Sequence, residues 1–196
     1  MTETLADFKA QGKVKAFGFS EISPASLRRA ACVHSVAAVQ SEYSLSTRAP
    51  ELGLVQACEA LGTTLVAFLP VGRGLLTDRR PTAESVSRSS FLKENPRFRE
   101  PNLSANIAAT DRFRAFSAEL QVPAASLATA WLLMRSSSVI PVPGTRNLEH
   151  LEELAAGVEL KLSKEILARL EEILPVGWAH GDRYSDGQWS GPERYC

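Results

Sequence analysis

The chain has 196 residues, 44% of them apolar, and its 22 acidic side chains balance its 22 lysines and arginines. A chain of this length and hydrophobicity buries one sizeable core, so we expect a single domain over residues 1–196. Without net charge there is no bulk field to attract nucleic acid or an anionic membrane, and we expect neither partner. No apolar run is long enough to span a bilayer, and the polar N-terminus does not resemble a signal peptide, which favours a cytoplasmic location.

The cysteines Cys32, Cys58 and Cys196 are odd in number and lack CxxC spacing. Cys32 and Cys58 lie in alanine-rich segments with helical periodicity, where we expect buried free thiols that pack as small apolar residues. This cysteine content fits a reducing compartment.

The chain begins with strand–helix units. After an amphipathic helix that ends near residues 11 and 12, apolar runs predict strands near 15–20, 36–40 and 64–69. Ser23 and Pro24 start a helix that runs to about Cys32. A second helix is expected over 50–61, with Gly62 as its C-cap. The third run is continuously apolar, as a strand covered on both faces of a parallel sheet requires.

The second half begins with a polar stretch from about residue 77 to 102, which we expect to be a lid or a binding loop. Helices follow over 104–120 and 124–135, then a strand over 139–142 that leads into another helix. A last helix starts at Ser163, and the tail from Pro175 has no periodicity.

Four strand–helix units in succession predict a parallel sheet with right-handed crossovers. They make either half of an eight-stranded barrel or a small open α/β sheet. In both cases the loops at the C-terminal ends of the strands form the site.

Several polar and aromatic residues lie at these strand ends. The Ser20 hydroxyl and the Gln40 amide match a planar carboxamide, and Phe68 offers a flat face for a heterocycle. Thr145 and Arg146 follow Gly144 at a helix start, where an anion is the natural ligand. Each feature alone has an ordinary alternative, such as a strand–turn–helix link with a solvated arginine. Together they suit a dinucleotide that lies across the ends of the strands.

Several motifs resemble the aldo-keto reductase family, most closely its bacterial and fungal branch with a PLGRGFLTG-like loop. The likeness covers nearly the whole chain, in order. Its segments are GKVK and GFSE (12–15, 18–21), VQSEYS (39–44), PVGRGLLT (70–77), NPRF (95–98), ATAWLL (128–133) and IPVPGTR (140–146).

The resemblance implies the C-terminal half of a TIM (β/α)8 barrel that binds NADP(H) along its rim. The residues that it assigns to the nicotinamide are Ser20, Glu21 and Gln40, which hold the carboxamide, and Phe68, which stacks on the ring. Those that it assigns to the phosphates and the adenosine are Val71, Gly72 and Arg73 at the pyrophosphate, Gly144, Thr145, Arg146 and His150 at the 2′-phosphate, and Glu153 at the adenosine. Leu154 replaces an asparagine that usually contacts adenine, which removes one cofactor contact.

The family's catalytic tyrosine, lysine, aspartate and histidine come from the first four strands, and the likeness begins just before the fifth. No residue of this chain is assigned to that tetrad, so the expected domain is truncated. Three hypotheses follow. The chain is a fragment or mis-started product of a reductase of small-molecule carbonyls, a non-catalytic nucleotide-binding or interaction half-barrel, or a half-barrel that self-associates through its open sheet edges.

Overall fold

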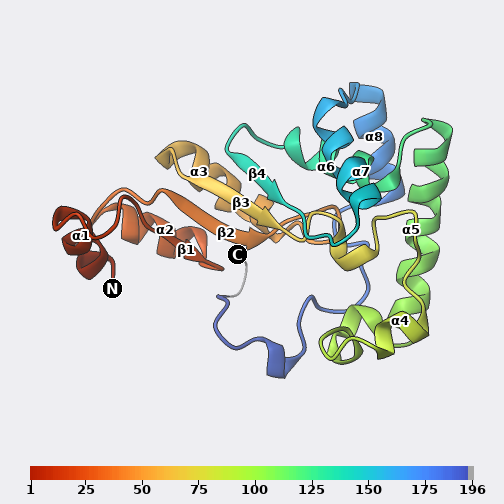
Figure 1. The fold of residues 1–196 in the computed structure, drawn as a ribbon, viewed down its shortest axis with the longest axis horizontal. Coiled ribbons are helices and arrows are strands. Elements are labelled where there is room, and N and C mark those ends of the chain that lie inside the picture. Colours follow the sequence, from red (N-terminus) through yellow and green to blue (C-terminus); the bar gives the residue numbers. More distant parts are fainter. Residues whose placement is uncertain (194–196) are drawn as a thin grey trace.

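A computed structural model describes residues 1–193. Its centre is one sheet of four parallel strands in the order β1-β2-β3-β4 (Figure 1). The strands are β1 (Gly18–Ser20), β2 (Ala38–Glu42), β3 (Thr64–Phe68) and β4 (Val139–Val142). Strands that follow one another in the sequence are neighbours in the sheet, and each crossover carries a helix. The four predicted βα units are confirmed, although β1 begins at Gly18 and is shorter than expected.

Within residues 1–193, eight α-helices surround or flank this sheet. They are α1 (Thr2–Ala10), α2 (Pro24–Ala31), α3 (Leu54–Leu61), α4 (Ala83–Ser87), α5 (Asn102–Glu119), α6 (Ala124–Leu133), α7 (Leu148–Glu159) and α8 (Lys164–Ile173). Local signals account for several ends: the Ser23 and Ser163 side chains accept hydrogen bonds from the first turns of α2 and α8. Gly62 closes α3 with φ 64°, a conformation that favours glycine. None of the helices described for residues 1–193 combines the length and hydropathy needed to cross a membrane.

The prediction of a helix over 50–61 is wrong at the N-terminal end of the helix. Residues Ala49–Leu52 form a 3-10 turn, and α3 begins only after Gly53, whose φ of 137° interrupts the helical path. The polar stretch after residue 77 is not an open loop either. It contains α4 and two further 3-10 turns, and it closes over a small second core of Leu75, Val86, Phe98 and Leu103.

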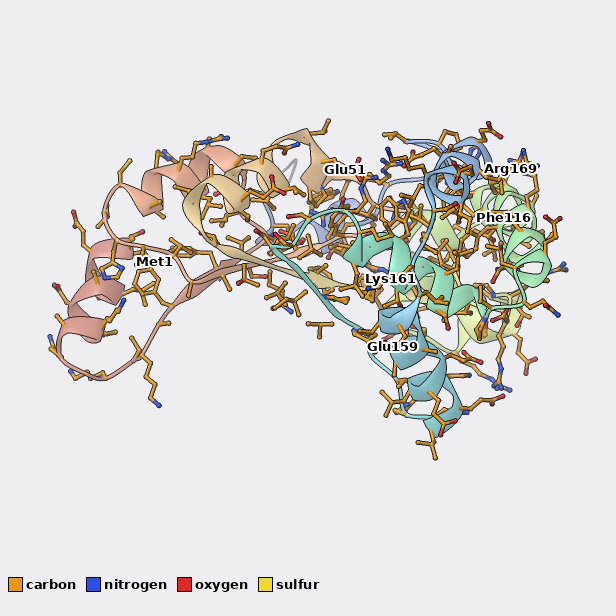
Figure 2. All side chains as sticks on the ribbon, turned by 90° about the horizontal axis from the view of Figure 1, so that it is seen from above. Met1, Glu51, Phe116, Glu159, Lys161 and Arg169 are labelled. Atoms are coloured by element: carbon orange, nitrogen blue, oxygen red, sulfur yellow. The ribbon has the colours of Figure 1, made fainter. Side chains whose placement is uncertain are left out.

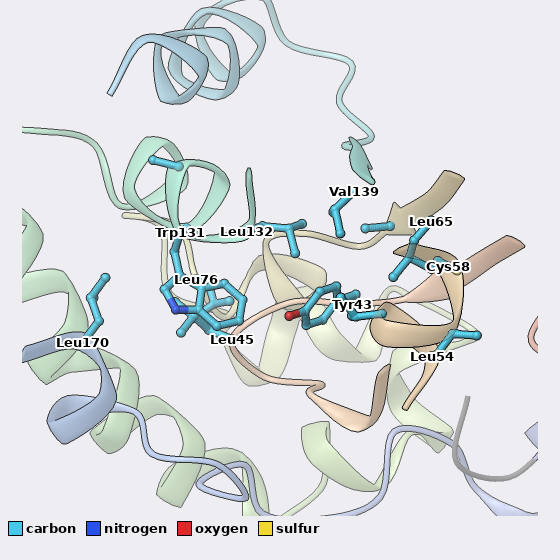
Figure 3. Packing of buried hydrophobic residues seen from close by; sticks show 14 of the residues in the cluster. Tyr43, Leu45, Leu54, Cys58, Leu65, Leu76, Trp131, Leu132, Val139 and Leu170 are labelled. Carbon is cyan, nitrogen blue, oxygen red and sulfur yellow. The ribbon is translucent and has the colours of Figure 1, made fainter. Parts of the chain in front are cut away.

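The main core lies between the sheet and the helices on one of its faces. Val39, Leu65 and Val139 face this core from adjacent strands, and all three are buried. Figure 3 shows Leu65 and Val139 in one cluster with Tyr43 and Trp131, and the rings of these last two residues meet edge to face with their centroids 5.9 Å apart. Such a core stabilises the sheet mainly by removing apolar surface from water.

The opposite face of the sheet is open. Ile140 and Val142 are 53% and 44% exposed, and Gln40 is exposed on the same face. Figure 2 shows α2 and α3 on one side of the strands and mainly side chains on the other. In a closed barrel this face would point inward and be covered by the other strands. The open face is what half of a barrel presents.

The two edge strands, β1 and β4, differ in what they offer to another strand. Leu65 N donates to Ser138 O at 2.8 Å, so by alternation the backbone groups of Val139, Pro141 and Pro143 point to the free edge of β4. Proline has no N–H to donate, and its presence makes this edge a poor site for pairing. Self-association through sheet edges stays a prediction, and β1 offers the better edge.

The expectation of a buried thiol is correct for one cysteine and wrong for another. Cys58 is buried in the main core, as expected. Cys32 is exposed, contrary to expectation: it is the C-cap of α2, and the buried side of this helix carries Leu27 and Ala30 instead. Cys196 lies outside the described residues.

Candidate functional site

The C-terminal ends of β1, β2 and β3 bring three of the predicted site residues onto the open face. Ser20 lies beside Gln40 in the β1–β2 register, and Phe68 lies beside Glu42, two residues further along β2. Parallel partners and residues two apart share a face. Ser20 and Gln40 are exposed and Phe68 is half-buried. A hydroxyl, an amide and an aromatic ring therefore lie together where a flat ligand can reach them.

Glu21 directly follows β1 and is held in a constrained position. Its φ is 53°, uncommon for a residue other than glycine, and it is only 6% exposed. Its Oε1 atom accepts hydrogen bonds from Arg183 Nη1 at 2.7 Å and from Glu42 N at 3.3 Å. Its Oε2 atom is buried, and residues 1–193 give it no hydrogen-bond partner. A buried acceptor without a partner is costly, and a ligand donor at this point would remove the cost.

The turn after β3 is built by Gly72, Arg73 and Gly74, and Arg73 has a φ of 56° within it. Gly72 has a φ of 57°, which favours glycine, and a Cβ atom there would lie 2.7 Å from Ser46 Oγ. The N–H groups of Gly72 and Gly74 already donate to carbonyls within the turn. The Arg73 side chain is also engaged, since Nη2 lies 2.6 Å from Glu42 Oε2.

A cavity of about 400 Å³ lies between the turn after β3 and the start of α7. Five of the predicted site residues line it, together with Leu154: Val71, Gly144, Thr145, His150 and Glu153. Arg146 is exposed and is not among the lining residues. Three charged residues, Asp78, Arg79 and Glu149, also line the cavity. Arg79 pairs with Glu149 at 3.0 Å, and Asp78 accepts a hydrogen bond from Ala124 N at the start of α6.

Local hydrogen bonds fix the entry into α7. Asn147 N donates to Thr145 Oγ1 at 3.1 Å, and Asn147 Oδ1 accepts from Glu149 N at 2.9 Å, which caps the helix. Further along, Gly157 allows α7 to approach Ser126 of α6 closely. The packing of α7 on α6 therefore positions the cavity wall.

A cluster of buried charges at the strand ends escaped the sequence analysis. Glu42 is 1% exposed and pairs with Arg73 at 2.6 Å and, more distantly, with Arg97 at 3.6 Å. Glu21 pairs with Arg183 of the tail at 2.7 Å. Arg97 belongs to a segment that resembles family motifs, but nothing in the sequence indicated which carboxylate it faces. The aperiodic tail gave no signal for Arg183.

Two tyrosines lie among the described residues, and both are poor proton donors. Tyr43 is fully buried, its hydroxyl donates to Glu51 Oε1 at 2.9 Å, and burial followed by the Glu51 charge raises its pKa. Burial, and then the charges of Glu21 and Glu42, also raise the pKa of Tyr184. Within residues 1–193 no group of three or more His, Cys, Asp or Glu side chains is placed to hold a metal ion.

Four parallel βα units with polar groups gathered at the strand ends are the arrangement that half of a (β/α)8 barrel presents. A family model described as "Aldo/keto reductase family" matches residues 1–175. The chain belongs to the aldo/keto reductase family.

Curated relatives agree with this assignment. The chain is 37% identical over 188 residues to "Probable aldo-keto reductase 1" of Glycine max, with 94% of this chain and 54% of that protein covered. It is 32% identical over 182 residues to "Aldo-keto reductase yakc (NADP(+))" of Schizosaccharomyces pombe and 31% identical over 182 residues to "Aldo-keto reductase str7" of Strobilurus tenacellus, each match covering 91% of this chain and 54% of the relative. The chain thus spans about half the length of the curated relatives that it matches.

Solved structures give the same result for the fold. The glycerol dehydrogenase AKR11B4 from Gluconobacter oxydans superposes with a TM-score of 0.74 at 23% identity, over 88% of this chain and 53% of that one. The thermostable aldo-keto reductase Tm1743, solved with the inhibitor epalrestat, gives 0.65 at 22% identity, over 88% and 55%. The expected C-terminal half of a TIM barrel is confirmed.

Proposed function

We propose that this chain is the cofactor-binding half of an NADP(H)-dependent oxidoreductase that reduces aldehydes or ketones to alcohols. The observation that carries the proposal is the grouping of Ser20, Gln40 and Phe68 on one face of the strand ends. A nicotinamide cofactor supplies a hydride when it is bound. The chain's own part is to hold the carboxamide between Ser20 and Gln40 and to stack Phe68 on the ring.

Glu21 gives independent support at the nicotinamide end. Its buried Oε2 atom has no partner within residues 1–193, and it lies one residue from Ser20. The carboxamide NH₂ is a donor of the kind that this atom lacks. A glutamate fits the amide nitrogen as well as the asparagine that is common at this place in the family, because only an acceptor is needed there.

The cavity beside α7 supports the proposal at the other end. Thr145 and His150 line it, the exposed Arg146 follows Thr145 in the chain, and these side chains would bind the 2′-phosphate of NADP(H). Glu153 would meet the adenosine, whereas Leu154 offers only an apolar side chain there. In the middle, Val71, Gly72 and Arg73 of the turn after β3 would border the pyrophosphate. The relative from Schizosaccharomyces pombe carries NADP(+) in its name.

A second candidate function is a nucleotide-binding half-barrel without chemistry. It is favoured by the two described tyrosines, because Tyr43 is buried against Glu51 and Tyr184 is engaged by Arg73 and Arg183. Loss of a general acid commonly costs about 10²- to 10⁴-fold in rate. On its own the chain is therefore expected to bind cofactor without reducing a small-molecule carbonyl, and the missing strands would supply the proton donor.

Titration of NADPH and NADH into the purified chain by calorimetry tests the proposal. We expect NADPH to bind at least about tenfold more tightly than NADH, because charged hydrogen bonds to the 2′-phosphate contribute about 1.5–3 kcal/mol. Arg146→Ala and His150→Ala should reduce this preference, while Arg88→Ala, at an exposed site on another segment, should leave it unchanged. Equal affinity for the two cofactors, or a preference that survives both substitutions, would show that this turn is only a strand–helix link.

A further inference from the structure

A second cavity lies between the loop after β2 and the C-terminal tail, and the cofactor proposal does not use it. Its volume is about 590 Å³, and it shares no lining residue with the cavity beside α7. The loop contributes Thr47, Arg48 and Leu52, and the tail contributes Val176. Glu51, which also lines it, is labelled in Figure 2.

Arg97 is one of the polar residues that line this cavity. Its side chain is 13% exposed, and its turn is held by Asn95, whose Oδ1 accepts from Arg97 N at 3.2 Å. Nε donates to Gly181 O at 3.3 Å and Nη1 donates to Thr47 Oγ1 at 2.6 Å. Within residues 1–193, no protein hydrogen bond uses Nη2, and this atom is not sealed from solvent. One pair of guanidinium hydrogens is therefore available to a ligand.

The positive charge of Arg97 is only partly matched. The Glu42 carboxylate lies 2.6 Å from Arg73 but 3.6 Å from Arg97, so one negative charge serves two guanidinium groups. Burial lowers the pKa of Arg97, and the charge of Glu42 only partly offsets this effect. The negative charges that act on Arg97 are thus a carboxylate that it shares with Arg73 and the exposed Asp182.

The other charged groups around the cavity are better balanced. Arg48 pairs with Glu51 at 2.7 Å and also contacts Glu171. Arg183 pairs with Glu21 at 2.7 Å. The remaining lining carboxylate, Asp182, is exposed and accepts hydrogen bonds from Arg183 N and Trp189 Nε1. An anion bound at Arg97 would therefore meet one exposed carboxylate and no unpaired buried one.

Apolar side chains line the same cavity. Leu52 and Val176 are 73% and 64% exposed, which is high for residues of this kind, and they come from its two sides. Covering them would remove apolar surface from water at about 25 cal/mol per Å². The cavity thus combines a cationic group with apolar walls.

We propose that this cavity binds a small organic anion, a carboxylate or a phosphate ester with a compact apolar body. The anionic head takes hydrogen bonds from Arg97 Nη2, and the body lies between Leu52 and Val176. Because the two walls belong to the β2–α3 loop and to the tail, the ligand fastens one to the other. Binding to the folded state alone also raises thermal stability as ligand concentration rises.

Calorimetric titration of the full chain with benzoate and with phenyl phosphate tests this proposal, with benzyl alcohol as the uncharged comparison. We expect at least one of the two anions to bind saturably with a Kd of about 1 mM or below, and benzyl alcohol to bind about tenfold more weakly or not at all. The stronger of the two anions identifies the head group. Absence of saturable binding by both anions, or equal binding of benzyl alcohol, would overturn the proposal.

Two pairs of variants locate the site. Arg97→Met should weaken the anion about tenfold or more, whereas Arg99→Met, at an exposed arginine two residues away, should not. Since Arg97 also supports the fold, Leu52→Asp provides a second test that places a negative charge at an exposed position of the wall. It should weaken the anions, while Leu148→Asp, at a 70% exposed position outside the cavity, should not. Unchanged affinity in Leu52→Asp, or equal loss in the members of a pair, would show that the anion binds elsewhere.

Discussion

Gly157→Ala tests the packing that positions the cavity beside α7. In an exposed helix this change stabilises by about 0.5–1 kcal/mol, because alanine has the higher helix propensity. Here the new Cβ atom would lie 2.6 Å from Ser126 O and 2.8 Å from Thr129 Cβ. The first of these atoms is backbone and cannot rotate away. Overpacking of this kind costs about 1–3 kcal/mol.

A shift of α7 would also disturb the bond from Ser126 Oγ to Glu153 O, which contributes about 0.5–1.5 kcal/mol. From these contributions together, we expect Gly157→Ala to lower the free energy of unfolding by about 2 kcal/mol. In a chain of this size, that loss lowers Tm by about 4–8 °C. Urea denaturation followed by circular dichroism measures the change. Gly144→Ala is the matched control, because a Cβ atom there meets nothing within 4 Å. A Gly157→Ala variant as stable as the parent would refute the close approach of α6 and α7.

Three further predictions concern the charges, the thiols and the open face. Glu42→Gln should lower the free energy of unfolding, measured by chemical denaturation, by about 3–5 kcal/mol, because Arg73 and Arg97 lose a buried counter-charge. Glu84→Gln, in an exposed pair with Arg88, should lower it by less than about 1 kcal/mol. Similar losses in the two variants would contradict the burial of Glu42. Burial raises the pKa of Cys58 to about 11, so at pH 8 a thiol reagent should label Cys32 quickly and Cys58 only when the protein unfolds. The labelling rates are measured in a Cys196→Ser background. Equal rates for Cys32 and Cys58 would be evidence against the burial of Cys58. If the chain self-associates through its open face, Val142→Lys should reduce the association seen by sedimentation and Leu148→Lys should not; the reverse order would place the contact on α7.

The order of the fold could be predicted because its signals are local. Each strand is a short apolar run, and Ser23, Gly62 and Ser163 mark helix ends through their own backbone or side-chain chemistry. The error over 50–61 arose because Gly53 interrupts a run that is otherwise helical in composition. The structure of α4 was missed because Val86 is held by contacts with Leu75, Phe98 and Leu103, which are distant along the chain.

The site was predictable to the same extent. Residues at strand ends meet because parallel strands end at one edge, which is how Ser20 and Gln40 come together. The partner of Glu21 could not be predicted, since Arg183 lies 162 residues away in a tail without periodicity. For Arg73, the turn was recognised from its glycines, but the direction of the side chain depends on Glu42, and no sequence rule specifies that pairing.

We propose that this chain binds the cofactor and that residues 1–193 offer no group placed to protonate the reduced carbonyl. The most direct test is aldehyde-dependent NADPH oxidation by the purified chain, with a reactive aromatic aldehyde as substrate. The account predicts no rate above the protein-free background. Steady turnover that is lost in Tyr184→Phe or Tyr43→Phe would contradict it, because one of these tyrosines would then be the missing acid.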